Sequence, residues 1–210
     1  MTVPAHLQYA LSCQNLYSLP STDPTRHKIG ALVFKIYDGN KVVARGSAKQ
    51  IDWMHDFNAF PIRTPALGTV DHGFYINVYP VFQYLASLNI KDLTFIGHSL
   101  GGAHATILAA LFTANNLPWS ELVTFGAPRP GYSKIKSLLS KDPSKSTAYR
   151  NNSDIVPTLP CKIGPFMYQD AIPHTQIGPD PDSTNIIRSH LIGSYISSLP
   201  AHLNYPPQGA

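Results

Sequence analysis

Short apolar runs alternate along this chain with segments whose apolar residues recur at helical spacing. Runs rich in β-branched and aromatic residues predict strands over residues 29–37, 93–96, 122–125 and 147–150. Helical spacing predicts helices over residues 5–19, 78–88, 103–112, 133–139 and 191–199. Alternating strands and helices are typical of a mostly parallel sheet with helices on both faces, so we expect an α/β fold.

The first strands are expected to pair as a hairpin. The turn-forming residues 38–40 separate the apolar run 29–37 from a second short run, 41–44. A tight turn makes its flanking strands antiparallel neighbours, so the sheet is expected to open with an antiparallel pair. With 210 residues, the chain is expected to form a single α/β domain spanning residues 1–210.

The predicted strand 93–96 leads into the pentapeptide Gly97-His98-Ser99-Leu100-Gly101. A small-residue helix, 103–112, follows it. Strand, sharp turn and helix form the setting of the G-x-S-x-G nucleophile elbow of α/β-hydrolases, which presents a serine at the tip of a strained turn. The two glycines allow neighbouring backbone to pass close to that turn. We therefore expect Ser99 to attack esters as a nucleophile.

The acid of such a site follows the nucleophile in the chain, and the base follows the acid. Asp154 is favoured as the acid because it comes just after the predicted strand 147–150, in a loop stiffened by Pro157 and Pro160. Three other downstream aspartates adjoin prolines in polar loops and suit solvated turns: Asp142, Asp180 and Asp182.

His190 is favoured as the base because it lies where the polar loop 179–185 gives way to the apolar helix 191–199. His174 is the alternative, although the alternating run 172–177 suits a strand-facing histidine better. His202 lies in a proline-rich tail, a poor setting for fixed geometry. In this interpretation His190 takes the proton of Ser99, and Asp154 holds the imidazole in the required tautomer.

An oxyanion hole is expected to accompany these residues. Its candidates are the backbone N–H of Leu100 and Ser47, which ends a predicted strand next to Gly46. Four further polar residues receive structural roles. His98 is expected to point away from Ser99 and pack the turn, and the other three are expected to satisfy buried backbone: His72, His104 and Arg129.

Residues 51–57 show the spacing of a short amphipathic helix, with Trp53, Met54 and Phe57 on its apolar side. Two interpretations are open on this pattern. The apolar side is either ordinary core or the underside of a lid that covers a substrate groove and turns outward at a lipid surface.

Composition narrows the function classes. Charged residues make up only 13% of the chain, and the formal net charge of +4 comes from scattered Lys and Arg, so we expect no nucleic-acid partner. No metal-ligand cluster is apparent, and we expect neither cofactor nor metal. Cys13 and Cys161 form either one disulfide or two free thiols. No signal peptide and no window of transmembrane length is found, so the chain is either intracellular or a mature form whose leader is absent.

Together these motifs resemble those of the class 3 triacylglycerol lipases of the filamentous-fungal type. The segments that carry the resemblance, in the family's order, are 43–47, 52–53, 72–74, 97–101, 124–129, 152–157 and His190. The resemblance implies an α/β-hydrolase fold, a Ser99, Asp154 and His190 triad, an oxyanion hole at Ser47 and Leu100, and a lid around Trp53. The family's tyrosine, usually three residues after the histidine, stands here at Tyr195.

We therefore expect a serine carboxylic ester hydrolase, a lipase that cleaves acylglycerols through an acyl-enzyme on Ser99 and makes transient contact with a lipid surface. The alternative on the same scaffold is a short-chain or feruloyl-type esterase, and a more distant alternative is a catalytically silent lipid-binding module. The resemblance implies secretion, with a cytoplasmic location as the alternative. The sequence does not determine an oligomeric state.

Overall fold

The computed structural model describes residues 2–47, 60–162, 167–178 and 186–204. Its centre is a seven-stranded sheet in the order β1-β2-β3-β6-β7-β8-β9. The strands are β1 (His27–Ile29), β2 (Leu32–Tyr37), β3 (Lys41–Ala44), β6 (Thr94–His98), β7 (Glu121–Phe125), β8 (Ser146–Asn151) and β9 (His174–Ile177). The pairs β1–β2 and β2–β3 are antiparallel, and every pair from β3 to β9 is parallel.

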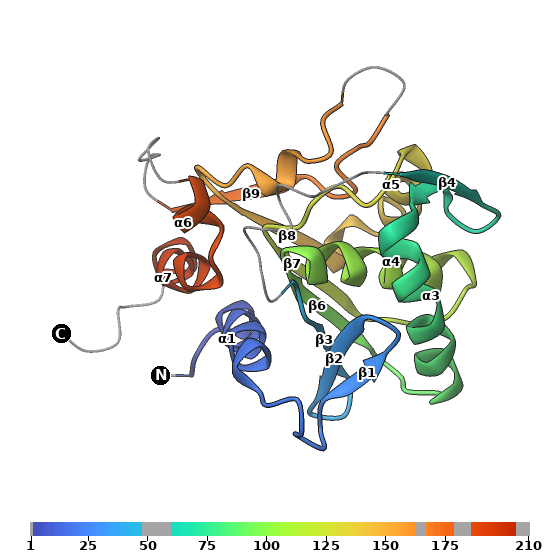
Figure 1. Ribbon diagram of the computed structural model, residues 1–210. Helices are drawn as coiled ribbons and strands as arrows, with labels where there is room; N and C mark the ends of the chain where they lie inside the picture. The colour runs from blue at the N-terminus through green and yellow to red at the C-terminus, as the bar shows by residue number, and fades with distance from the viewer. Residues whose placement is uncertain (1, 48–59, 163–166, 179–185, 205–210) are drawn as a thin grey trace.

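Helices cover both faces of this sheet (Figure 1). One face carries α1 (Ala5–Ser18) and α7 (Ile192–His202). The other face carries α3 (His72–Ser87), α4 (Leu100–Ala114) and α5 (Ser133–Leu139). The short helix α6 (Ile186–His190) precedes α7, and two 3-10 turns, η1 (Pro143–Lys145) and η2 (Val156–Thr158), flank β8. This arrangement confirms the expected α/β architecture.

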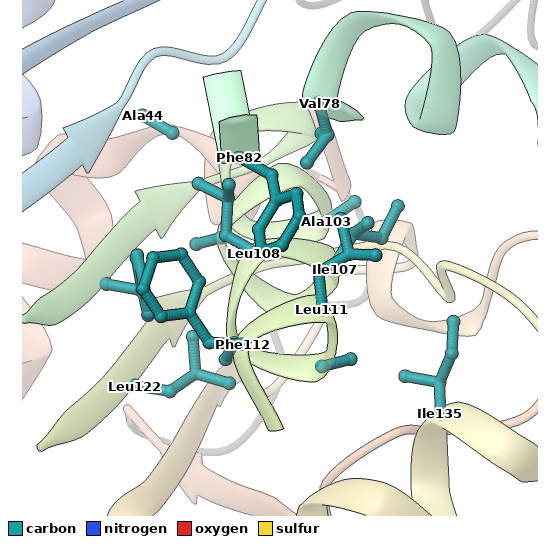
Figure 2. Packing of buried hydrophobic residues seen from close by; sticks show 14 of the residues in the cluster. Ala44, Val78, Phe82, Ala103, Ile107, Leu108, Leu111, Phe112, Leu122 and Ile135 are labelled. Carbon is teal, nitrogen blue, oxygen red and sulfur yellow. The ribbon is translucent and has the colours of Figure 1, made fainter. Parts of the chain in front are cut away.

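The two cores follow from alternation along the strands, since successive strand residues point to opposite faces. Phe95 and Leu122 belong to the core under α3, α4 and α5, whereas their neighbours Ile96 and Val123 belong to the core under α1 and α7. Every residue of α4 from Gly101 to Phe112 is buried, because the helix is enclosed by the sheet and by α3. Figure 2 shows this packing, with Phe82 of α3 among the side chains around α4.

The first two strands and the segment before α3 differ from the sequence predictions. The predicted strand 29–37 is two strands, because Gly30 adopts a φ of +59° and turns the chain between β1 and β2. The sheet therefore opens with three antiparallel strands. A separate hairpin of β4 (Pro61–Thr64) and β5 (Gly68–Asp71) was not predicted. It leads into α3, where the Asp71 side chain caps the first turn by accepting a hydrogen bond from the Phe74 N–H.

The disulfide alternative is excluded, because both cysteines are free: Cys13 is a buried residue of α1, and Cys161 is exposed. None of the helices within the described ranges is long and apolar enough to cross a membrane. The predicted amphipathic helix over 51–57, with Trp53, Met54 and Phe57, lies outside the described residues.

Candidate active site

Ser99 lies on a strained turn between β6 and α4. Its φ of +57° is rare for a residue with a side chain and costs about 1–3 kcal/mol, which the surrounding packing must offset. The two glycines of the motif make that packing possible. A Cβ on Gly97 would lie 2.2 Å from the Gly101 carbonyl oxygen, and a Cβ on Gly101 would lie 2.1 Å from the Ala44 carbonyl oxygen. The turn is therefore the predicted elbow, with backbone passing on two sides.

The structure brings Ser99, His190 and Asp154 together in one buried chain of hydrogen bonds. His190 Nε2 lies 2.8 Å from Ser99 Oγ, and His190 Nδ1 lies 2.8 Å from Asp154 Oδ2. The three residues are at most 2% exposed. A carboxylate only accepts hydrogen bonds, so an ionised Asp154 keeps the imidazole proton on Nδ1 and leaves Nε2 to accept the serine proton.

His190 reaches this position from the end of a helix, where a loop was predicted. It is the last residue of α6, and Leu191 links it to α7. The competing histidines lie elsewhere: His174 begins β9 and His202 ends α7, where its ring meets the edge of Tyr149. His202 was predicted to lie in a proline-rich tail without fixed geometry, but α7 continues through Pro200 and ends at His202.

Asp154 is held from several sides. Its Oδ1 accepts a 2.9 Å hydrogen bond from the Val156 N–H, and its Oδ2 accepts a 2.6 Å hydrogen bond from the Tyr195 hydroxyl. The same hydroxyl accepts a 3.1 Å bond from the Asn151 N–H. Burial, and then the charge of Asp154, raise the pKa of Tyr195 well above its usual value, so the phenol stays a donor. Its contact with Asp154 was not found in the sequence analysis.

Arg129 stabilises the loop that follows Asp154. Its guanidinium bonds the carbonyl oxygens of Thr158 and Pro160 and pairs with Asp170 at 2.6 Å. This agrees with the prediction that Arg129 satisfies buried backbone. The prediction was wrong for His104, because within the described ranges neither of its buried ring nitrogens has a hydrogen-bond partner.

His98 makes a contact that the sequence did not predict, because it meets the histidine of the site. Its ring stacks on that of His190 with centroids 5.0 Å apart, and its Nε2 lies 2.7 Å from the His190 carbonyl oxygen. Burial, followed by the charge of His190, lowers the pKa of His98 well below its usual value, so the ring is neutral. Since a carbonyl only accepts, Nε2 carries the proton, and Nδ1 accepts from the Tyr17 hydroxyl at 3.0 Å.

The segments that carry the two expected oxyanion donors pass close to Ser99. Ala44 of β3 pairs with Gly97 of β6, so Gly46 and Ser47 run past the elbow at the carboxyl edge of the sheet. A Cβ on Gly46 would lie 3.3 Å from Ser99 Cβ, which shows how closely this backbone approaches the serine. Leu100, the residue after Ser99, begins α4.

Across the described ranges, no group of three or more His, Cys, Asp or Glu side chains is arranged to hold a metal ion.

The fold, together with the buried hydrogen bonds that link Ser99, His190 and Asp154, defines a protein of the α/β-hydrolase fold class. Residues 41–163, more than half of the chain, match the family model described as lipase (class 3), and the chain belongs to that family. The resemblance seen in the sequence is thus confirmed.

Curated relatives share about 30% identity with this chain. Phospholipase A1-II 1 of Oryza sativa subsp. indica aligns over 164 residues, 62% of this chain and 40% of that protein. Secreted mono- and diacylglycerol lipase 1 of Fusarium solani aligns over 151 residues, 65% of this chain and 44% of that protein. The chain thus spans less than half the length of the curated relatives it matches.

Solved structures share the fold at lower identity. Lip2 lipase from Yarrowia lipolytica superposes with a TM-score of 0.63 at 17% identity, covering 88% of this chain and 90% of that one. The Rhizomucor miehei lipase propeptide complex superposes with a TM-score of 0.58 at 21% identity, covering 89% and 77%. Both confirm the α/β-hydrolase fold.

Proposed function

We propose that this protein is a serine carboxylic ester hydrolase that cleaves acylglycerols through an acyl-enzyme on Ser99. One observation carries the proposal: the continuous buried hydrogen-bond chain from Ser99 through His190 to Asp154. A nucleophile, a base and an orienting carboxylate within hydrogen-bond reach are the arrangement that covalent ester hydrolysis requires. Membership of the class 3 lipase family supports the same conclusion.

In the proposed reaction, His190 carries each proton transfer. His190 Nε2 removes the Ser99 proton as Oγ bonds to the ester carbonyl carbon, and Asp154 stabilises the imidazolium that forms. The backbone N–H of Leu100 and the Ser47 residue stabilise the negative oxygen of the tetrahedral intermediate. The bond to the alcohol then breaks as His190 returns the proton to the alcohol oxygen. In the second half of the reaction, His190 takes a proton from a water molecule, and the water oxygen attacks the acyl carbon. The carboxylic acid then leaves Ser99, whose oxygen takes the proton back from His190.

Acylglycerols are proposed as substrates because of the relatives' names. The Fusarium solani relative is called a mono- and diacylglycerol lipase, and the rice relative a phospholipase A1. Substrates of this kind gather at lipid surfaces, so the protein is proposed to act there. We assign the activity to one α/β-hydrolase domain, residues 1–210, because both core clusters are built on the same sheet.

Hydrolysis of p-nitrophenyl esters of increasing acyl length tests the proposal, with Ser99→Ala as the inactive variant. Ser99→Gly is the matched control for folding, because glycine adopts a φ of +57° without strain. Both variants are expected to fold and to lose turnover. In the wild-type protein, an organophosphonate is expected to label Ser99 alone. Activity in Ser99→Ala comparable to wild type would exclude the mechanism. Rates that peak at short chains and do not rise on substrate aggregation would identify an esterase on this scaffold.

Secretion is proposed from the name of the Fusarium solani relative. Immunodetection of the full-length protein in the medium and in the cells of its native host tests this. A protein found only inside the cells would contradict secretion.

A further inference from the structure

A pocket of about 680 Å³ lies next to the elbow, and the mechanism above uses only Ser47 and Leu100 of its lining. One side of it is formed by Gly46, Ser47 and Leu100, the segments that flank Ser99. Its lining also includes two basic residues, Arg26, which precedes β1, and Lys28 of β1. A molecule held in this pocket therefore lies within reach of the reacting serine.

Among the residues that the structure describes, no carboxylate accompanies the positive charges of this pocket. Arg45 also lines it, and the Nε atoms of Arg26 and Arg45 are buried and form no hydrogen bond within the described part of the chain. No aspartate or glutamate of the described residues lines the pocket. Burial, followed by the nearby charge of Arg26, lowers the pKa of Arg45. Two guanidinium groups placed together without a carboxylate are unfavourable unless an anion accompanies them.

His104 adds an independent observation on the inner wall. It is only 3% exposed, lines the same pocket, and has two ring nitrogens without a hydrogen-bond partner among the described residues. Burial lowers its pKa to about 3, so the ring is neutral and carries one N–H. An unpaired buried donor costs free energy, which a bound acceptor oxygen would recover.

We propose that this pocket binds the phosphate of a glycerophospholipid, with Arg26 and Arg45 contacting the phosphate while an acyl ester of the same molecule lies at Ser99. The inference rests on the proposed ester hydrolysis and names its substrate class. A lipid phosphate is favoured over free phosphate because the pocket is far larger than a phosphate ion. Its remaining wall includes the apolar residues Ala31 and Val33, and it is continuous with the Ser47 side of the site.

The first test compares two monomeric substrates with the same acyl chains, dihexanoyl phosphatidylglycerol and dihexanoylglycerol. Arg26→Gln is expected to lower the ratio of their kcat/KM values about tenfold to a hundredfold, the range for losing a hydrogen bond to a charged group. Arg63→Gln, an exposed arginine on β4 that removes the same charge outside the pocket, is the matched control and should leave the ratio unchanged. Equal effects of both variants, or an equal loss on both substrates in Arg26→Gln, would overturn the inference.

If Arg26→Gln does not fold, Lys28→Gln replaces it, because Lys28 is exposed at the pocket rim. A smaller fall in the same ratio is then expected, and an unchanged ratio would overturn the inference.

The second test measures binding without turnover, by calorimetry on Ser99→Ala. Dihexanoyl phosphatidylglycerol is expected to bind, and adding Arg26→Gln is expected to weaken this binding by the same factor as in the kinetic test. Inorganic phosphate binding equally well would mean a free-phosphate site and would overturn the lipid assignment. Arg26-dependent binding in a protein that hydrolyses neither lipid would refute the proposed function alone. Hydrolysis of both lipids without dependence on Arg26 would refute the pocket alone.

Discussion

The Tyr195 hydroxyl donates a 2.6 Å hydrogen bond to Asp154 Oδ2, the same oxygen that faces His190 Nδ1 at 2.8 Å. Tyr195 lies on α7 and Asp154 follows β8, so the last long helix of the chain holds the carboxylate of the site. Because Asp154 Oδ2 contacts both the Tyr195 hydroxyl and His190 Nδ1, the orientation of the imidazole depends on Tyr195, which is fully buried.

Tyr195→Phe is expected to lower kcat about tenfold with little change in KM, because the carboxylate loses a hydrogen bond that orients it. The Asn151 N–H also loses its acceptor, so the free energy of unfolding should fall by about 1–3 kcal/mol. Ester hydrolysis and urea unfolding measure the two effects. Tyr37→Phe, which removes a hydrogen-bonded phenol on β2, is the control and should retain kcat. An unchanged kcat in Tyr195→Phe would show that Asp154 is positioned without the phenol.

Gly126→Ala is expected to abolish most activity. Gly126 has a φ of +60°, and a Cβ there would lie 2.6 Å from Asp154 Oδ2 and 3.1 Å from His190 Nδ1. The matched control is Gly39→Ala, where φ is +79° but no atom lies within 4 Å of the added Cβ. Both variants acquire backbone strain of about 1–2 kcal/mol, so thermal unfolding should report a loss in each. Only Gly126→Ala should lose kcat, and equal activity losses would assign the effect to strain rather than to the displaced carboxylate.

Ser47→Ala tests the oxyanion hole. Removing one donor to the tetrahedral oxyanion is expected to lower kcat by roughly ten to a thousand times while KM changes little. Steady-state kinetics on a soluble ester measure this. Ser137→Ala, an exposed serine on α5, serves as the control. A change confined to KM would place Ser47 in substrate binding and outside the oxyanion hole.

His104 makes stability depend on pH with a predictable sign. Burial lowers its pKa from 6.5 to about 3, so between these values the unfolded chain binds a proton that the folded chain does not. Stability is therefore lost as pH falls through this window. His104→Leu removes this contribution. The free energy of unfolding of the variant, minus that of wild type, should therefore be about 2 kcal/mol larger at about pH 5 than at about pH 7.5. An offset between His104→Leu and wild type that stays the same at both pH values would contradict the prediction.

Much of the fold was predictable because it depends on local pattern. The strand 93–96, the elbow and the helix after it are adjacent in the chain, and the glycines at 97 and 101 mark where backbone must pass closely. The chain order of nucleophile, acid and base limited the choice to a few residues, and the structure brings the chosen three together. The extra turn at Gly30 was missed because an isolated glycine inside an apolar run does not by itself indicate a turn.

The sequence by itself determined the layered α/β fold, the strained serine turn and the residues that can accompany it, since periodicity and turn chemistry act over a few neighbouring positions. Only the tertiary structure decided which residues, distant in the sequence, support the side chains of the site. His98 meets His190 across 92 positions, and Tyr195 meets Asp154 across 41. Arg26 joins Arg45 in one pocket, where none of the described lining residues is a carboxylate. These contacts depend on how the parallel strands and α7 pack, because burial removes water and leaves each polar group dependent on partners that no local pattern specifies.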